Sequence, residues 1–286
     1  MAELLTVLDV VQRSADFLEK KGVDSPRLSA EWMIAHALGL DRMALYLQFD
    51  RPLIEEELSA MRDSVARRGK REPLQYVLGQ TQFHELTLKC DPRALIPRPE
   101  TEQLVERIMG DGLEIDGEYR ILDLGTGSGA IALALAMGLP KASIVATDAS
   151  DEALALAKEN GLLCGLQTRV DFRLSNWFER LNDESGFDVI VSNPPYLTQS
   201  ELDSAENEVR AFEPHSALVA VDEGMADLKT IIEGAYPKLA NGGVLWLETG
   251  IDQRDALLDS CRAAGYSTCE GFDDWSDRPR FIRAKK

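Results

Sequence analysis

The sequence feature that most constrains the fold is a strand-like run that leads through a glycine-rich loop into a helix-like run. Residues 120–124, Arg-Ile-Leu-Asp-Leu, have the apolar content of a buried strand, and residues 130–136 form an uninterrupted Ala, Ile and Leu run. Between them lie Gly-Thr-Gly-Ser-Gly at residues 125–129. A strand, a glycine loop and a helix in this order are typical of the nucleotide-binding start of a doubly wound parallel sheet.

Beyond this start, the chain from residue 100 onward alternates between strand-like and helix-like runs, as a parallel sheet requires. Strand patterns are found at residues 119–124, 143–148, 170–174, 187–191, 243–247 and near 281–283. Helix patterns lie before and between them at residues 102–109, 131–137, 152–160, 225–239 and 253–264. These runs predict an α/β fold of the Rossmann-like type. Six strand patterns are visible, and we interpret the domain as a seven-stranded sheet.

The glycine loop taken alone admits two ligands. With Ala130 it fits the G-x-G-x-x-G/A dinucleotide pattern, but Asp123 lies two residues before its first glycine. We expect that carboxylate at the mouth of the site, where it would repel a pyrophosphate and attract an ammonium group. Alternating glycines also let the backbone pass close to a bulky ligand. S-adenosylmethionine is therefore favoured over NAD, and the residues expected to bind it are Gly125, Thr126, Gly127, Ser128 and Gly129.

An acid ends the second strand pattern, at residues 143–148. This residue, Asp148, lies at about the spacing from the glycine loop at which such sheets bind a ribose. The alternative is an N-cap for the helix at residues 152–160, but Ser150 or Asp151 can cap that helix instead. We therefore favour ribose binding for Asp148.

A second loop, Ser-Asn-Pro-Pro-Tyr at residues 192–196, directly follows the strand pattern at residues 187–191. Its two prolines fix φ and remove two backbone donors, so the carbonyls of Asn193 and Pro194 are left for another partner. The Asn193 side chain adds an acceptor, and Tyr196 adds an aromatic face. Acceptors gathered at one point suit an NH2 group.

Holding an NH2 group in this way has a chemical use, because an amide or exocyclic amine nitrogen has a delocalised lone pair and is a poor nucleophile. Acceptors on its hydrogens favour a pyramidal nitrogen that can attack a methyl group, without a strong base or a metal ion. A surface turn with a packed tyrosine is the alternative for the tetrapeptide alone. The candidate catalytic residues are Asn193, Pro194, Pro195 and Tyr196, and Asn193 is also expected to border the cofactor.

The N-terminal region has a different pattern. Residues 1–72 are rich in Leu, Ala, Glu and Arg at helical spacing, which predicts a small helical domain, and by elimination we expect it to recognise the substrate. Residues 73–99 alternate like a β-hairpin and are expected to link it to a catalytic domain at residues 100–286. Arg98 and Glu100 either border the pocket or form a surface ion pair. Residues 201–217 are expected to form a polar loop over the substrate.

Composition narrows the choice of partners. The chain has 31 basic and 49 acidic residues, a net charge of −18, which argues against sequence-independent binding of nucleic acid. Its four cysteines lack the spacing of a zinc site or a disulfide framework. No apolar run approaches a membrane span, and the N-terminus lacks a signal-peptide pattern. We expect a soluble, cytoplasmic protein that binds neither membranes nor nucleic acid directly.

Five motifs can be read together across nearly the whole chain. They are Gln-Tyr-Val-Leu-Gly at 75–79, Ile-Pro-Arg-Pro-Glu-Thr-Glu at 96–102, Leu-Asp-Leu-Gly-Thr-Gly-Ser-Gly at 122–129, Asn-Pro-Pro-Tyr at 193–196 and Glu-Pro at 213–214. In this combination the chain resembles the peptide chain release factor glutamine N5-methyltransferases, also called the HemK or PrmC family. It departs from them at Glu85, where the family more commonly has glycine.

The resemblance implies a class I S-adenosylmethionine-dependent methyltransferase domain that methylates the glutamine of the Gly-Gly-Gln motif in bacterial class I peptide chain release factors. It places an adenine-contacting residue at Trp177. In the implied mechanism Asn193 and Pro194 accept the amide hydrogens and Tyr196 walls the glutamine. Two alternatives stay open at this point. One is an adenine N6-methyltransferase, because Asn-Pro-Pro-Tyr occurs there too, and the other is a non-catalytic module that only binds S-adenosylmethionine.

Overall fold

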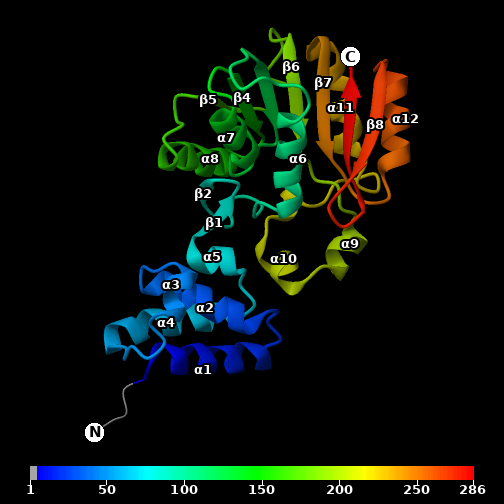
Figure 1. Ribbon diagram of the computed structural model, residues 1–286. Helices are drawn as coiled ribbons and strands as arrows, with labels where there is room; N and C mark the ends of the chain where they lie inside the picture. Colours follow the sequence, from blue (N-terminus) through cyan, green and yellow to red (C-terminus); the bar gives the residue numbers. More distant parts are fainter. Residues whose placement is uncertain (1–4) are drawn as a thin grey trace. The chain divides into compact units, whose positions relative to one another are not determined.

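The computed structural model describes residues 5–286, which form two compact units (Figure 1). The smaller unit contains the chain up to Gln80 together with Glu206–Phe212. The larger unit contains Thr81–Ala205 and Glu213–Lys286. Residues 1–4 of the expected helical region lie outside the described part of the chain.

The smaller unit is helical. Its elements are α1 (Val7–Lys20), α2 (Pro26–Ala37), α3 (Arg42–Tyr46), α4 (Glu55–Arg68), α5 (Leu74–Leu78) and α10 (Asn207–Phe212). The helix α1 starts at a capping box, in which the Thr6 hydroxyl accepts from the Asp9 amide and the Asp9 carboxylate accepts from the Thr6 amide. The apolar face of α1 is buried, with Val7 and Val11 in a cluster that also contains Ile34 of α2.

The helix α10 belongs to this unit through one buried carboxylate. Glu208 accepts hydrogen bonds from Arg68 at 2.9 Å and from Arg71 at 2.6 Å. Burial alone would raise the pKa of Glu208, but the two guanidinium groups together lower it below its ordinary value. Because an unpaired buried charge is costly, these pairs hold Glu206–Phe212 within the helical unit.

The segment expected to be a polar loop, residues 201–217, is in fact partly helical. It contains the end of α9 (Gln199–Ser204), all of α10 and the 3-10 turn η1 (His215–Ala217). The expectation was wrong because Thr198 and Glu201 form a capping box, whose T-x-x-E spacing starts α9 despite its polar composition.

The expected hairpin is present but shorter than residues 73–99. Its strands are β1 (Gln80–Phe83) and β2 (Leu86–Lys89), whereas Leu74–Leu78 is the helix α5. The turn places His84 at φ 50°, and the His84 backbone amide donates to Glu102 at 3.2 Å. The turn geometry therefore rests on His84, and Glu85 takes no left-handed conformation.

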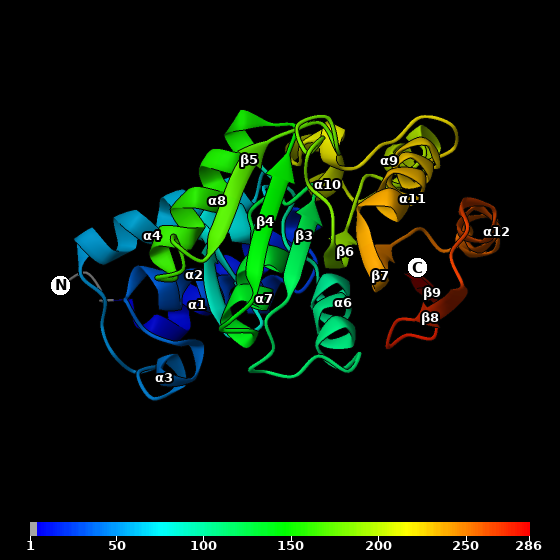
Figure 2. The same cartoon turned by 90° about the horizontal axis from the view of Figure 1, so that it is seen from above.

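The larger unit is built on a seven-stranded sheet with the strand order β5-β4-β3-β6-β7-β9-β8 (Figure 2). Its strands are β3 (Arg120–Leu124), β4 (Ser143–Asp148), β5 (Val170–Leu174), β6 (Phe187–Ser192), β7 (Leu239–Glu248), β8 (Thr268–Asp273) and β9 (Pro279–Lys285). The first five are parallel to one another, and β9 pairs antiparallel with β7 and β8. This confirms the predicted α/β fold and its number of strands.

Alternate residues of the strands point to two apolar layers. Ile121 and Val189 contribute to one layer, and Leu122 and Ile190 contribute to the other. The first layer is covered by α6 (Pro99–Met109) and α7 (Ala130–Gly138), and α8 (Asp151–Leu163) packs against β4 and β5. The second is covered by α11 (Ala226–Lys238) and α12 (Arg254–Ala264). Within residues 5–286, no helix combines the length and the apolar character needed to cross a membrane.

Candidate active site

The two loops singled out from the sequence leave the sheet from neighbouring strands. The chain runs from β3 outward through β4 and β5, then returns to place β6 on the other side of β3. Leu124 at the end of β3 is paired with Ser192 at the end of β6, and the Ser192 hydroxyl donates to the Leu124 carbonyl at 2.7 Å. The site therefore lies where the strand order reverses, outside the carboxyl ends of the strands, as expected for an open parallel sheet.

The glycine loop has a backbone that side chains would disturb. Gly125, Gly127 and Gly129 have φ values of 72°, 55° and 84°, in the left-handed region that favours glycine. A Cβ atom on Gly129 would also lie 3.2 Å from the Cβ of Ala157 in α8. The amides of Gly125 and Thr126 donate to the Thr147 carbonyl at 2.8 and 2.9 Å, which fixes the loop against the end of β4.

Asp148 is held in place by backbone amides. Its Oδ2 atom accepts from the Gly127 amide at 2.8 Å, and its Oδ1 atom accepts from the Ser150 amide at 2.9 Å. Burial raises the pKa of Asp148, and these hydrogen bonds oppose that shift. The helix α8 is capped by Ser150, whose hydroxyl accepts from the Ala153 amide at 3.2 Å, so Asp148 is not needed as the cap.

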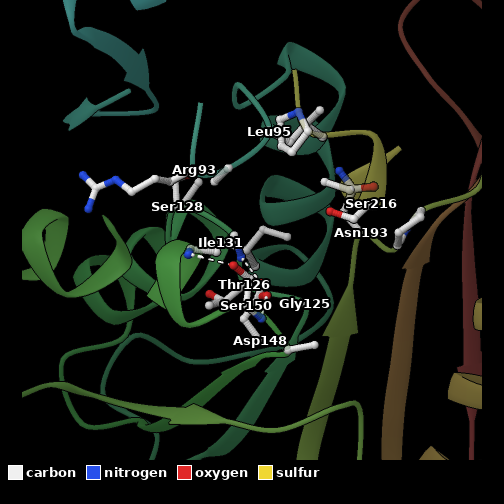
Figure 3. Close-up of a pocket in the computed structure, with 18 of the residues that line it drawn as sticks. Arg93, Leu95, Gly125, Thr126, Ser128, Ile131, Asp148, Ser150, Asn193 and Ser216 are labelled. Atoms are coloured by element: carbon white, nitrogen blue, oxygen red, sulfur yellow. Dashed lines mark hydrogen bonds between the residues drawn. The ribbon is translucent and has the colours of Figure 1, made fainter. Parts of the chain in front are cut away.

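A cavity of about 500 Å³ lies between the glycine loop and the Asn-Pro-Pro-Tyr loop (Figure 3). That is within the range of roughly 300–1,000 Å³ for small-molecule sites. The candidate residues that line it are Gly125, Thr126, Gly127, Ser128, Asp148, Trp177, Asn193 and Pro195. Of the three remaining candidates, Gly129 is the N-cap of α7, Pro194 is buried and does not line the cavity, and Tyr196 packs into the apolar layer beside α11 and α12.

The indole of Trp177 forms one wall of the cavity. Trp177 has φ 45°, a conformation that costs a bulky residue of order 1–3 kcal/mol. Its Nε1 atom donates to Asp227 at 3.2 Å, and its ring lies close enough to Gly125 that a Cβ there would be 3.4 Å from it. The strained backbone and the hydrogen bond together set the position of a flat apolar face beside the glycine loop.

Another part of the cavity lining, formed by residues 96–98 and Pro214, was only partly expected. Glu213 is buried, and it accepts from the Ile96 amide at 3.2 Å and from Arg98 at 2.6 Å. Arg98 therefore does not form an ion pair with Glu100, which instead pairs with Arg278 at 3.1 Å. The Glu-Pro and Ile-Pro-Arg-Pro-Glu-Thr-Glu motifs thus meet at one carboxylate beside the cavity.

The sequence led us to expect Asp123 at the mouth of the site, but the structure does not place it there. Its side chain is fully buried on β3, its Oδ2 atom accepts from the Thr126 hydroxyl at 2.6 Å, and its Oδ1 atom has no hydrogen-bond partner among the described residues. Burial raises its pKa to about 7, opposed by the Thr126 hydrogen bond. The expectation failed because every residue of β3 after Arg120 is buried within the sheet.

This burial predicts a measurable pH dependence. With a pKa of about 7 in the folded chain against an ordinary value of 3.8, Asp123 binds its proton more tightly when folded. Its contribution to stability is therefore present at low pH and is lost as the pH rises toward about 7. An Asp123→Asn variant lacks this loss. The difference in free energy of unfolding, variant minus wild type, should therefore increase by about 2 kcal/mol from about pH 5.5 to about pH 8. Urea unfolding measures the difference, and parallel pH profiles would contradict the assignment.

Two residues of the site were missed from the sequence. The Nδ2 atom of Asn193 donates to the Thr101 hydroxyl at 3.0 Å, and that hydroxyl donates to Glu248 at 2.8 Å. Tyr196 donates to the other oxygen of Glu248 at 3.1 Å. A signal was available, because Thr101 lies in the 96–102 motif and Glu248 directly follows the strand pattern at 243–247.

The parts of this site fit an adenosine ligand with an attached amino acid. The glycine cradle leaves room for a close ligand, the Asp148 carboxylate offers acceptors for ribose hydroxyls, and the Trp177 indole offers an apolar face for a base. Within residues 5–286 no group of three or more His, Cys, Asp or Glu is placed to hold a metal ion.

Comparisons with known proteins agree with this geometry. Residues 9–79 match the PrmC N-terminal domain, and residues 101–213 match the methyltransferase small domain. The release factor glutamine methyltransferase of Geobacter sulfurreducens is 42% identical over 267 residues, which cover 93% of this chain and 92% of that protein. The release factor glutamine methyltransferase of Vibrio cholerae is 39% identical over 276 residues, 96% of this chain and 95% of that protein.

Solved structures share the fold at low identity. A methyltransferase from Pyrococcus furiosus has a TM-score of 0.52 and 18% identity, covering 71% of this chain and 90% of its own. A SAM-dependent methyltransferase from Agrobacterium tumefaciens has a TM-score of 0.52 and 16% identity, covering 72% and 69%. At these identities the likeness supports the fold alone.

The fold and the relatives together define a methyltransferase of the seven-stranded class I type. More narrowly, the chain belongs to the family of release factor glutamine methyltransferases. This confirms the resemblance seen in the motifs, the assignment as an enzyme, and S-adenosylmethionine as the methyl donor.

Proposed function

We propose that this protein methylates the side-chain amide nitrogen, N5, of the glutamine in the Gly-Gly-Gln motif of class I peptide chain release factors. The observation that carries the proposal is the placement of Asn193 at the wall of one cavity with the glycine loop and Asp148. Relatives that share nearly the whole length of the chain bear the name release factor glutamine methyltransferase. The reaction needs a methyl donor and a gripped amide within reach of each other.

Each residue then has a defined task. Gly125–Gly129 hold the methionine part of the donor, and Asp148 accepts from the ribose hydroxyls. The indole of Trp177 borders the adenine. When bound, S-adenosylmethionine supplies an electrophilic methyl group on its sulfonium sulfur. This division agrees with the cavity, in which Asp148 and Trp177 belong to the part formed by β4 and β5 and Asn193 to the part beside β6.

The Asn-Pro-Pro-Tyr loop acts on the glutamine. The Oδ1 atom of Asn193 and the carbonyl of Pro194 accept the two hydrogens of the substrate amide, which localises the lone pair on nitrogen. Pro195 keeps the loop rigid, because its ring fixes φ. The acceptors act by orientation and electrostatics, so no side chain has to remove a proton before the methyl group is transferred. The proton is lost to water afterwards.

The acidic composition of the chain supports a protein substrate. With a net charge of −18, the molecule would repel the phosphate backbone that sequence-independent nucleic-acid binding relies on. The helical unit is proposed to take part in recognising the release factor, and the match of residues 9–79 to the PrmC N-terminal domain supports a family-specific role for it.

Mass spectrometry of the substrate tests the proposal directly. Purified class I release factor is incubated with the protein and S-adenosylmethionine, and one added methyl group is expected on the glutamine of the Gly-Gly-Gln peptide. A release factor with alanine in place of that glutamine is the matched control and should gain none. Labelled methyl transferred to adenine in DNA but not to release factor would overturn the proposal in favour of N6-methylation of adenine.

A further inference from the structure

A chain of hydrogen bonds lies directly behind the Asn-Pro-Pro-Tyr loop. Glu248 at the end of β7 is 1% exposed, and Thr101 in the first turn of α6 is 4% exposed. Thr101 contacts Asn193 on one side and Glu248 on the other, at 3.0 and 2.8 Å. Three segments far apart in sequence thus meet at one buried hydroxyl.

The donor and acceptor in each of these hydrogen bonds follow from the number of protons that each side chain carries. An ionised carboxylate can only accept, so the Thr101 hydroxyl must use its single proton toward Glu248. The Thr101 oxygen is then left as an acceptor, and it can pair only with the NH2 end of the Asn193 amide. A flipped amide would place Oδ1 against the Thr101 oxygen with no proton between them. Glu248 therefore determines which end of the Asn193 amide is turned away from Thr101.

The second oxygen of Glu248 contacts Tyr196, the last residue of the Asn-Pro-Pro-Tyr motif. Tyr196 donates to it at 3.1 Å, and Arg280 donates to the Tyr196 hydroxyl at 3.3 Å and to the Thr249 carbonyl at 3.1 Å. One buried carboxylate thus accepts two hydrogen bonds. One comes from Thr101, which in turn accepts from Asn193, and the other comes directly from Tyr196. Burial raises the pKa of Glu248, and the hydrogen bonds from Thr101 and Tyr196 together with the nearby Arg280 cation oppose that rise and favour the ionised carboxylate.

We propose that Glu248 and Thr101 are positioning residues for the methyl-transfer reaction, which set the orientation of the Asn193 amide so that its Oδ1 acceptor faces the substrate. This inference rests on the proposed function. A flipped Asn193 would present an NH2 group to the NH2 group of the glutamine, so that donor would meet donor. The cavity borders Asn193 and Thr101 but not Glu248, so Glu248 acts only through its neighbours.

The central test is a cycle of variants at Thr101 and Asn193. Thr101→Val keeps the shape of the side chain and removes the hydroxyl, and it should lower kcat by about 10- to 100-fold, since small displacements of a positioning group have effects of that size. Thr101→Ser keeps the hydroxyl and should stay within about threefold of wild type. In an Asn193→Ala background, Thr101→Val should have little further effect, because residues that act as one unit are not additive.

A merely structural role for Thr101 predicts a different pattern. It would lower kcat by the same factor with or without the Asn193 side chain, and it would also shift the melting temperature or the affinity for S-adenosylmethionine. Equal losses in the two backgrounds, or a Thr101→Val enzyme with wild-type kcat, would overturn the proposal. Glu248→Gln, which can donate to Thr101 and reverse the chain, should reduce kcat by about tenfold or more with unchanged affinity for S-adenosylmethionine.

A spectroscopic measurement separates this inference from the proposed function. The side-chain NH2 resonances of Asn193 can be assigned in the protein alone by their loss in Asn193→Ala. They should shift in Thr101→Val and stay in place in Thr101→Ser, whether or not release factor is methylated. Asn193 resonances that do not shift in Thr101→Val would contradict the proposed orientation of the Asn193 amide. Thr101-dependent resonances in a protein that cannot methylate release factor would instead refute only the proposed function.

Discussion

Replacing Asn193 with alanine is expected to lower the rate of methyl transfer to release factor by roughly 10²-fold or more, with nearly unchanged affinity for S-adenosylmethionine. Asn193 contributes the side-chain acceptor at the cavity wall, and its NH2 end is already used by Thr101. Loss of one preorganised hydrogen-bonding group at a reacting centre has effects of this size. Single-turnover transfer of labelled methyl, combined with calorimetric titration of the cofactor, measures the two quantities separately.

The matched control is Asn182→Ala, which removes an exposed asparagine on the turn before β6. Its rate and cofactor affinity should equal those of wild type. Should Asn193→Ala also turn over at the wild-type rate, Asn193 has no part in the mechanism. Should it lose cofactor binding instead of rate, its task is to shape the cavity rather than to hold the amide.

The glycine loop and the Asn-Pro-Pro-Tyr loop could be located from the sequence because local chemistry determines them. Each follows an apolar strand pattern, and each contains residues that no ordinary turn needs. Strands β4 and β5 begin and end at the predicted residues for the same reason, since their patterns are bounded by polar or glycine-containing segments. The strand β8 had no such signal, because it lies at the edge of the sheet and none of its residues is fully buried.

What could not be predicted depends on contacts between distant parts of the chain. Thr101 and Glu248 are separated by 147 residues, and although each lies in or directly after a recognised pattern, nothing local indicates that their side chains meet. Glu208 likewise joins α10 to Arg68 and Arg71 across more than a hundred residues. Asp123 was misplaced because the β3 run in which it lies is buried up to its last residue, so its closeness to the glycine loop does not bring its carboxylate to the mouth of the site.

The second large effect is expected for Asp148→Ala, which should weaken binding of S-adenosylmethionine by roughly 10²-fold. Two backbone amides already fix the Asp148 carboxylate, which lines the cavity and has further lone pairs with which to accept hydrogen bonds. Each hydrogen bond from a ribose hydroxyl to a charged acceptor is worth about 1.5–3 kcal/mol, and at saturating donor kcat should change little. Isothermal titration gives the affinity, with Asp151→Ala at the exposed start of α8 as the control.

A pair of ligands distinguishes ribose binding by Asp148 from support of the glycine loop. Asp148→Ala also leaves the Gly127 amide without its partner, which could weaken binding by loosening the loop. If the carboxylate binds the ribose, wild type should prefer S-adenosylhomocysteine over its 2′,3′-dideoxy analogue, and Asp148→Ala should lose that preference. If the variant weakens both ligands by the same factor, the carboxylate supports the loop and the ribose is held elsewhere. An isotherm that matches wild type for S-adenosylhomocysteine itself would remove Asp148 from the binding site altogether.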